Sequence, residues 1–475
     1  MKKLLSLLLT FCLIFSLTAC GSSADSSSSE ESEQSVVSSA ESSDNETEEE
    51  SSEESSETTS DETLGEFNQD ATIEETVLYD QDNVVIKATG LNYTNYSVEL
   101  DVSIENNSDK DLSFVSGSLG YSCNSINGYM VNDGYLNCDV ASGKKANDTI
   151  SFNYDSLMLY GINEVADMEI AFSISDDDFN YTYSGPCALT TSAYDSHDYD
   201  TDLYQETITS DEAINTYNYE MSAFSQDTLY DVNGVKVLSS GIIVNKDGET
   251  GLLLELENTT SDIVNVVTSD ISLNGLLVYS SNYSSDTINP GKKAIVDIMT
   301  SAILDSEYWS VYGIDEIGSI GLALSQNDSE NNEISDKTNI EVTIPNAKAE
   351  FDASGTEVYN NNGLRIVAKT VLEDSSEYSG DMHVLLLAEN TSGKTLEIDD
   401  VYDSVSVNSV MTDYLFSGEE IPDGKSAVLD IQLQESSLED NGFASTSDIS
   451  DVEISLDISD ENDTIDSPTL TISFE

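Results

Sequence analysis

The chain has 475 residues, enough for about three domains of ordinary size. It carries 92 Asp and Glu against 16 Lys and Arg, a net charge of −76 at pH 7, so it repels phosphate backbones, which argues strongly against nucleic-acid binding. Two His and one Arg leave little for His-based catalysis or anion capture, whereas the 38% of hydrophobic residues suffice for folded cores.

The first residues have the pattern of an export signal. Two lysines follow Met1, and residues 4–17 are almost wholly apolar, a stretch typical of a signal-peptide core and too short to span a membrane comfortably. The segment Leu17-Thr18-Ala19-Cys20-Gly21 comes next. An ordinary secretory signal, with Cys20 incidental, is the alternative interpretation of this segment.

The order of apolar core, small residues and cysteine resembles the lipobox of bacterial lipoproteins. In that family the cysteine receives diacylglycerol and the signal peptide is cut just before it. The resemblance implies a signal peptide over 1–19 and a lipid anchor on Cys20 whose acyl chains, such as palmitate, hold the protein on the outer side of the cell membrane. The chain is similar in this respect to uncharacterised Gram-positive surface lipoproteins.

A spacer follows the cysteine. Residues 21–66 contain 17 Ser, 16 Asp and Glu, and no Lys or Arg. Such a segment cannot bury enough apolar surface to offset the entropy of ordering it. We therefore predict a lipidated cysteine and a disordered acidic tether over 20–70.

Beyond residue 70 the chain repeats itself. Four motifs recur in the same order, and the gap from the Asn of the second to the Gly of the third is 37, 33 and 34 residues. The matching segments are 78–80, 229–231 and 358–360; 104–107, 256–259 and 388–391; 143–146, 291–294 and 424–427; and, in two copies, 161–165 and 313–317. This indicates three copies of one fold.

The repeats predict three domains and two linkers. The domains span 71–192, 226–345 and 355–475, and each has about 120 residues, enough for a core of its own. The segment 193–225 is rich in Asp and Tyr and is predicted to be a linker, with a helical turn at 210–214. A shorter linker is predicted at 346–354.

Within each copy, apolar and polar residues alternate, as they do along 98–104, 252–256 and 452–458. This period of two is typical of half-buried antiparallel strands, and turn signals such as Asn-Gly separate the runs. Seven or so short strands per copy predict an all-β chain of three tandem immunoglobulin-like β-sandwich domains. Short helices are expected at 155–160 and 301–309.

Three cysteines follow the tether. Cys187 lies where the other copies have buried apolar residues, so it is expected to be buried. Cys123 and Cys138 are a possible disulfide, since an exported chain can keep one. Two unrelated thiols are the alternative.

Three acidic clusters have the residue type that calcium sites use. The run 198–202 imitates the first half of an EF-hand loop, but Leu203 stands where the loop needs Gly and Thr209 where it needs Glu. The clusters 176–178 and 399–400 are interpreted as solvated turns. His197 is expected to be solvated and His383 to lie at the surface or in packing, so we predict no metal and no cofactor.

No catalytic motif is present, and the chain is predicted not to be an enzyme. Glycan binding needs exposed aromatic platforms, and the chain has 24 Tyr and one Trp. The function predicted is that of a membrane-anchored surface lipoprotein displaying sandwiches for binding or adhesion. A glycan-binding or glycan-processing accessory protein is the alternative, and the ligand, a surface protein or a glycan, is left open. A row of exposed aromatics would favour glycan, and smooth acidic faces would favour protein.

Overall fold

The computed structural model describes residues 64–117, 124–279, 284–300, 306–374, 379–416, 418–460 and 463–474. All of them belong to one compact unit. The predicted signal peptide, Cys20 and the tether up to residue 63 lie outside the described residues, and so does Cys123.

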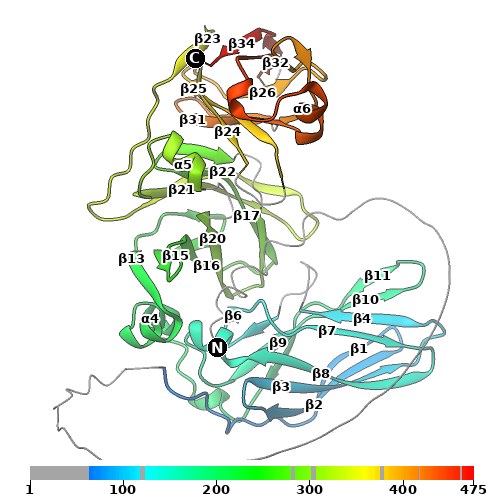
Figure 1. The fold of residues 1–475 in the computed structure, drawn as a ribbon. Helices are drawn as coiled ribbons and strands as arrows, with labels where there is room; N and C mark the ends of the chain where they lie inside the picture. Colours follow the sequence, from blue (N-terminus) through cyan, green and yellow to red (C-terminus); the bar gives the residue numbers. More distant parts are fainter. Residues whose placement is uncertain are drawn as a thin grey trace, which may run out of the picture. The chain divides into compact units, whose positions relative to one another are not determined.

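The described chain is mostly β-strand, and its strands form sandwiches around three hydrophobic clusters (Figure 1). The predicted all-β, multi-domain sandwich fold is confirmed. Each sandwich has a first sheet that is antiparallel. Its strand over 97–106 in the first sandwich alternates buried and half-buried side chains, as the period of two predicts, whereas the matching strands over 250–258 and 382–390 are buried along almost their whole length.

In the first sandwich this sheet has the order β1-β2-β3-β8, and two short sheets pack against it. Its strands are β1 (Thr76–Gln81), β2 (Val84–Tyr93), β3 (Ser97–Asn106) and β8 (Lys144–Asn153). One short sheet holds β4 (Leu112–Ser116), β7 (Leu136–Val140), β10 (Ser173–Asp176) and β11 (Tyr181–Tyr183). The other holds β5 (Ser125–Ile126), β6 (Tyr129–Met130), β9 (Asp167–Ile170) and β12 (Cys187–Thr190). Helix α2 (Tyr154–Leu159) follows β8, close to the predicted position.

The second sandwich repeats the plan. Its first sheet holds β13 (Tyr219–Ser225), β14 (Asp231–Val232), β15 (Val235–Asn245), β16 (Thr250–Asn258) and β20 (Lys293–Met299). Its second holds β17 (Val264–Leu273), β18 (Leu276–Tyr279), β19 (Ser284–Ile288), β21 (Ser319–Asn327) and β22 (Glu333–Thr343). Helix α5 (Ser306–Val311) overlaps the predicted helix at 301–309 and ends two residues beyond it.

The third sandwich has the same first sheet, made of β23 (Thr356–Asn361), β24 (Leu364–Glu373), β25 (Met382–Asn390) and β31 (Ser426–Leu433), with β29 (Tyr414–Phe416) beside β31. The facing sheet holds β26 (Leu396–Asp400), β27 (Ser406–Val407), β28 (Val410–Met411), β30 (Glu419–Ile421), β32 (Asp451–Ser459), β33 (Thr464–Asp466) and β34 (Thr469–Ser473). Helices α6 (Glu435–Asn441) and η3 (Thr446–Asp448) lie between β31 and β32.

A buried asparagine ends the third strand of each first sheet. Asn106, Asn258 and Asn390 each have no exposed surface. Each Nδ2 donates to two backbone carbonyls at 2.7–2.9 Å, and each Oδ1 accepts a backbone N–H two residues on. The second repeated motif of the sequence is therefore a loop clamp, made identically in all three copies.

The segment 193–225 is more ordered than a linker. It contains η1 (Tyr194–Ser196), α3 (Leu203–Ile208) and α4 (Asp211–Tyr217), so the predicted helical turn is present. Strand β13 pairs with β15, which makes it part of the second sandwich. The sequence shows little alternation here because the helices bury only a few side chains, such as Tyr204 and Ile208.

The folded region also begins before residue 71, which corrects the predicted end of the tether. Phe67 is buried and its ring stacks on Tyr154 with 4.4 Å between centroids. Asn68 N–H donates to Asn163 O (2.7 Å). The predicted linker 346–354 packs likewise, because Phe351 contacts the second cluster and Asp352 N–H donates to Tyr312 O (2.6 Å).

The first and second sandwiches meet through a strand contact. Tyr129 of β6 pairs in parallel with Lys293 of β20, and Lys293 N–H donates to Gly128 O (2.9 Å). The Lys293 ammonium pairs with Asp202 and lies 3.3 Å from Glu255 Oε1. Glu255 is almost wholly buried, so these partners offset the cost of removing it from water.

The second and third sandwiches meet in the same way with apolar side chains. Leu276 and Leu277 of β18 pair in parallel with Ser426 and Ala427 of β31. Leu277 packs into the third hydrophobic cluster. We call the β6–β20 contact the first junction and the β18–β31 contact the second junction.

Candidate binding surface

The cysteines lie in apolar surroundings. Cys138 is buried on β7, and burial, reinforced by the charge of Asp148, raises the pKa of its thiol. Cys187 is buried on β12 as expected, and burial raises its pKa as well. Both thiols are thus poor nucleophiles. Because Cys123 lies outside the described residues, its disulfide with Cys138 stays a prediction.

The acidic clusters use their carboxylates to hold their own loops. Asp198 accepts from Asp200 N (2.9 Å) and Thr201 Oγ1 (2.9 Å). Asp202 caps α3 and pairs with Lys293, and Asp400 accepts from the Tyr414 hydroxyl. Within the described residues, no three His, Cys, Asp or Glu side chains are grouped as a metal site requires.

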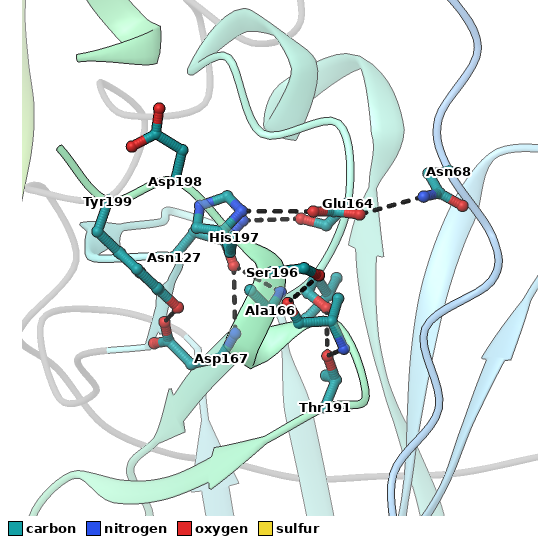
Figure 2. A network of polar contacts seen from close by, with 12 residues as sticks. Asn68, Asn127, Glu164, Ala166, Asp167, Thr191, Ser196, His197, Asp198 and Tyr199 are labelled. Carbon is teal, nitrogen blue, oxygen red and sulfur yellow. Dashed lines mark hydrogen bonds and ion pairs between the residues drawn. The ribbon is translucent and has the colours of Figure 1, made fainter. Parts of the chain in front are cut away.

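His197 is not solvated, in contrast to the sequence interpretation. Figure 2 shows Glu164 between His197 and Asn68: His197 Nδ1 lies 3.4 Å from Glu164 Oε1, and Asn68 Nδ2 donates to Glu164 Oε2 (3.1 Å). The imidazole also meets the ring of Tyr199 edge-on at 4.5 Å. Tyr199 in turn donates to Asp167.

This network fastens three segments that are distant in sequence. It joins the chain before β1, the β5–β6 hairpin and the chain after β12 (Figure 2). Glu164, Asn127 and Asp167 each bond to groups of other segments, so we assign the network to folding rather than to chemistry. His383 is also a packing residue, because it is buried with Nδ1 2.7 Å from Asp430 Oδ2.

The β10–β11 hairpin presents three exposed aromatic side chains. Phe179 lies at its tip and is 76% exposed, and Tyr181 and Tyr183 follow on β11, both exposed. Residues two apart on a strand share a face, so the two tyrosines form a row. β11 is also the last strand of its sheet, which leaves the row beside an open edge (Figure 1). We call these residues the aromatic hairpin.

The turn of the aromatic hairpin is held by one carboxylate. Asp176 accepts from Asp178 N (3.0 Å), Asn180 N (3.0 Å) and Asn180 Nδ2 (2.9 Å). Asp176 also pairs with Lys110, which lies in the loop between β3 and β4. Lys110, followed by the Asn180 bonds, holds the pKa of Asp176 well below its usual range.

Phe179 is strained in this turn. Its φ is 60°, a left-handed conformation that is unfavourable for a bulky residue. The second sandwich builds the same turn around Asp328, and there Asn331, which tolerates this conformation, occupies the equivalent position at φ 63°. Tyr181 likewise corresponds to Glu333. An exposed, strained phenylalanine that contributes no burial points to a binding role.

The recurring tyrosines pack rather than bind. Tyr79 and Tyr230 are buried, and Tyr359 packs against the third cluster and donates to Asp466 (2.8 Å). The sequence could not separate these from the aromatic hairpin by residue type. The signal that separates them is the absence of Phe179 and Tyr181 from the other copies.

The third sandwich has a hollow of about 460 Å³. Four carboxylates line it, from Glu373, Asp374, Glu435 and Glu439, together with Met382 and Leu438. It is open to solvent, and no Lys, Arg or His lies in its lining. In the described residues, no helix has the length and apolar character needed to cross a membrane.

Comparisons with known proteins gave no family. No family model matches the chain, and no curated protein matches it. Among solved structures, a bacterial ice-binding adhesin matches with 9% identity over 79% of this chain and 90% of its own, at a TM-score of 0.13. The exo-β-D-glucosaminidase CsxA matches with 12% identity over 50% of this chain and 26% of its own, at 0.17. A Ca²⁺-stabilised adhesin of an Antarctic bacterium matches with 12% identity over 79% and 68%, at 0.13. These scores are too low for any of the three to carry an argument about this chain.

Proposed function

We propose that this protein is a membrane-anchored surface lipoprotein that binds a glycan through the aromatic hairpin and acts in adhesion rather than in catalysis. The observation that supports binding is the strained, exposed Phe179 beside Tyr181 and Tyr183, present in one copy of three. The lipobox-like segment around Cys20 supports the anchor.

The chemistry of the hairpin favours a neutral glycan over a protein. Sugar rings present C–H faces that pack on aromatic rings, and their hydroxyls donate to carboxylates such as Asp177 and Asp178 beside the tip. The strong negative charge of the chain disfavours anionic polysaccharides. A glycan-processing role would need a reactive site, and we place none in this proposal.

Replacing Phe179 by Asn separates binding from folding. Asn is the residue at the equivalent position of the second sandwich, so Phe179→Asn should relieve strain and raise the free energy of unfolding by about 1 kcal/mol. The same change should weaken glycan binding at least tenfold, because it removes the most exposed ring of the hairpin. Denaturant unfolding and sedimentation with insoluble neutral polysaccharides measure the two effects.

Matched controls decide whether the hairpin or aromatic content in general is responsible. Tyr181→Ser should also weaken binding, whereas Tyr96→Ser, at a tyrosine 75% exposed in another turn, should leave it unchanged. Equal binding by wild type and Phe179→Asn would refute the glycan proposal. A loss of stability in Phe179→Asn would show instead that Phe179 has a packing role.

The anchor has its own test. Cys20→Ala should leave the chain unprocessed or release it into the medium, because no other acylation site is proposed. Fractionation of cells and intact mass of the protein measure this. A variant that stays in the membrane fraction at its normal mature mass would contradict the proposed lipidation.

A further inference from the structure

The β5–β6 and β17–β18 hairpins form the two junctions, and the β27–β28 hairpin is their counterpart in the third sandwich. All three have the same turn, and we call the β27–β28 hairpin the third hairpin. Asn127, Asn274 and Asn408 each begin a two-residue turn at φ 49°, 52° and 50°. Their Nδ2 atoms donate to Glu164 O, Glu316 O and Asp448 O at 2.7–2.9 Å, and their Oδ1 atoms accept backbone N–H groups at the start of a neighbouring strand. Three hairpins therefore hold the same geometry, although only two of them lie at a junction.

In the third hairpin the turn strains the backbone. Ser409 occupies the second turn position at φ 68°, where the first two hairpins have glycine. A serine in the left-handed region is strained, so the turn is maintained by its surroundings, chiefly the bonds of Asn408. The hairpin has thus retained the form that pairs with a following sandwich.

The strand that follows the turn is β6, β18 or β28 in the three copies, and it carries apolar side chains in each. These side chains are exposed only in the third copy. Tyr129 is 7% exposed and Leu276 is fully buried in their junctions. At the equivalent positions of the third sandwich, Val410 is 41% exposed and Met411 is 59% exposed. β28, which carries them, is the last strand of its sheet within the described residues. An exposed apolar edge of this kind is a template for pairing.

The charges beside the third hairpin match those of the first junction. There, Lys292 Nζ lies 3.8 Å from Asp167 Oδ1 and 3.2 Å from Glu169 Oε1. Because Asn127 and Asn408 bond the N–H groups of Asp167 and Asp451, these two aspartates correspond. Glu453 then corresponds to Glu169.

The second junction has a different chemistry at these positions. Its Asn274 bonds Ser319, so Ser319 and Gly321 stand where the first junction has two acids. The third hairpin is therefore built for a strand that carries a lysine, as in the first junction, and not for an apolar strand.

Among the residues that the structure describes, one such strand has no neighbour on its outer side. The sequence Gly-Lys-Lys-Ala occurs twice, at 291–294, where it forms the first junction, and at 143–146. The second occurrence begins β8, which is an edge strand of its sheet in the described chain. Lys144 corresponds to Lys292, and its side chain is exposed. Ser103, which pairs with Asn147 on β8, stands where the first junction has Glu255, so that buried acid has no counterpart here.

We propose that the third hairpin of one copy docks on the start of β8 of a second copy, with Val410 and Met411 against the strand and Lys144 between Asp451 and Glu453. The contact is head to tail, so it leaves a free hairpin at one end and a free β8 at the other and extends into chains of copies. The interface between copies lacks the contacts that α3 adds to the first junction, so its affinity is low. Anchoring on one membrane raises the local concentration that supports it.

Two complementary variants test the inference on residues 21–475, which keep every described residue. Wild type should show an average mass in sedimentation equilibrium that rises with concentration and falls with added salt. Met411→Asp removes the hairpin side and Lys144→Glu removes the β8 side, so each alone should be monomeric. Their equimolar mixture should form a 1:1 dimer and nothing larger, because only one pair of functional sides remains.

The mixture separates this arrangement from its alternatives. A symmetric contact between two hairpins would leave Lys144→Glu associating and the mixture no different from its parts, which would overturn the proposal. A monomeric wild type at every concentration would overturn it as well. Tyr96→Asp and Lys348→Glu, at exposed positions away from both edges, are the matched controls and should associate as wild type does. Melting curves check that all variants are folded.

Discussion

Asn390→Asp should destabilise the third sandwich by about 3–5 kcal/mol, the cost of burying a charge that only one backbone N–H, that of Ser392, can pair. The two side chains have nearly the same shape, so the change creates no cavity. Asn390 Nδ2 donates to Lys394 O and Ile421 O, both at 2.7 Å. A carboxylate cannot donate, so it would place its charge against two carbonyl oxygens in a site with no exposed surface.

The measurement is denaturant unfolding of residues 21–475, monitored with a probe in the third sandwich. Asn390→Ala should cost less, about 2 kcal/mol, because it leaves the two carbonyls unpaired but adds no charge. Asn360→Asp, at an exposed position of β23, is the isosteric control and should change stability by no more than about 0.5 kcal/mol. Unfolding of Asn390→Asp at the wild-type midpoint would contradict the role given to the clamp.

The sequence repeats predicted the clamp only in part. They aligned Asn106, Asn258 and Asn390, and the alternation of the neighbouring residues predicted the strands that they end. They could not show what the amides bond, because the accepting carbonyls lie up to 34 residues away along the chain. Local patterns set strand type and face, whereas pairing is decided by contacts distant in sequence.

The same limit explains the errors of the sequence interpretation. His197 looked solvated because its chain neighbours are acids, yet Glu164, 33 residues earlier, covers it. Phe67 was assigned to the tether because its neighbours are polar, yet it stacks on Tyr154. Each is a single apolar or aromatic residue in a polar stretch, and no periodicity reports on one residue. The aromatic hairpin was missed for a different reason: exposure cannot be read from residue type.

The second large effect expected is on the pH dependence of stability, and three groups that are partly or wholly buried, Asp286, Asp297 and His383, set its sign. Burial, followed by the charge of Asp297, raises the pKa of Asp286 to about 7, and burial also raises that of Asp297. An acid whose pKa is raised by folding binds more protons in the folded state, so its contribution to stability falls as pH rises between the unfolded and folded pKa values. Burial opposes the charged form of His383, but the hydrogen bond and charge of Asp430 outweigh it and raise its pKa. The stability that His383 adds is therefore also lost as pH rises above its ordinary range.

Acids that pair with donors act in the opposite direction at low pH. Hydrogen bonds from Asn332 lower the pKa of Asp328, as Lys110 does for Asp176, so the stability that these carboxylates add is lost as pH falls through their folded pKa values. The free energy of unfolding should therefore be greatest near about pH 4, close to the ordinary pKa of aspartate. Between there and pH 8 it should fall by about 2 kcal/mol, which allows for the water that reaches the partly exposed Asp286.

Asp286→Asn should remove most of the decline on the alkaline side. The amide carries no charge at any pH, so this variant should be more stable than wild type at pH 8 and nearly equal to it at about pH 4. Asp195→Asn, at an exposed acid of η1, is the matched control and should keep the wild-type slope. The measurement is denaturant unfolding across this pH range at constant ionic strength, since the net charge of −76 makes stability sensitive to salt as well. A wild type equally stable at both pH values, or a variant with the wild-type slope, would show that water reaches the Asp286 carboxylate and that its burial does not govern the fold.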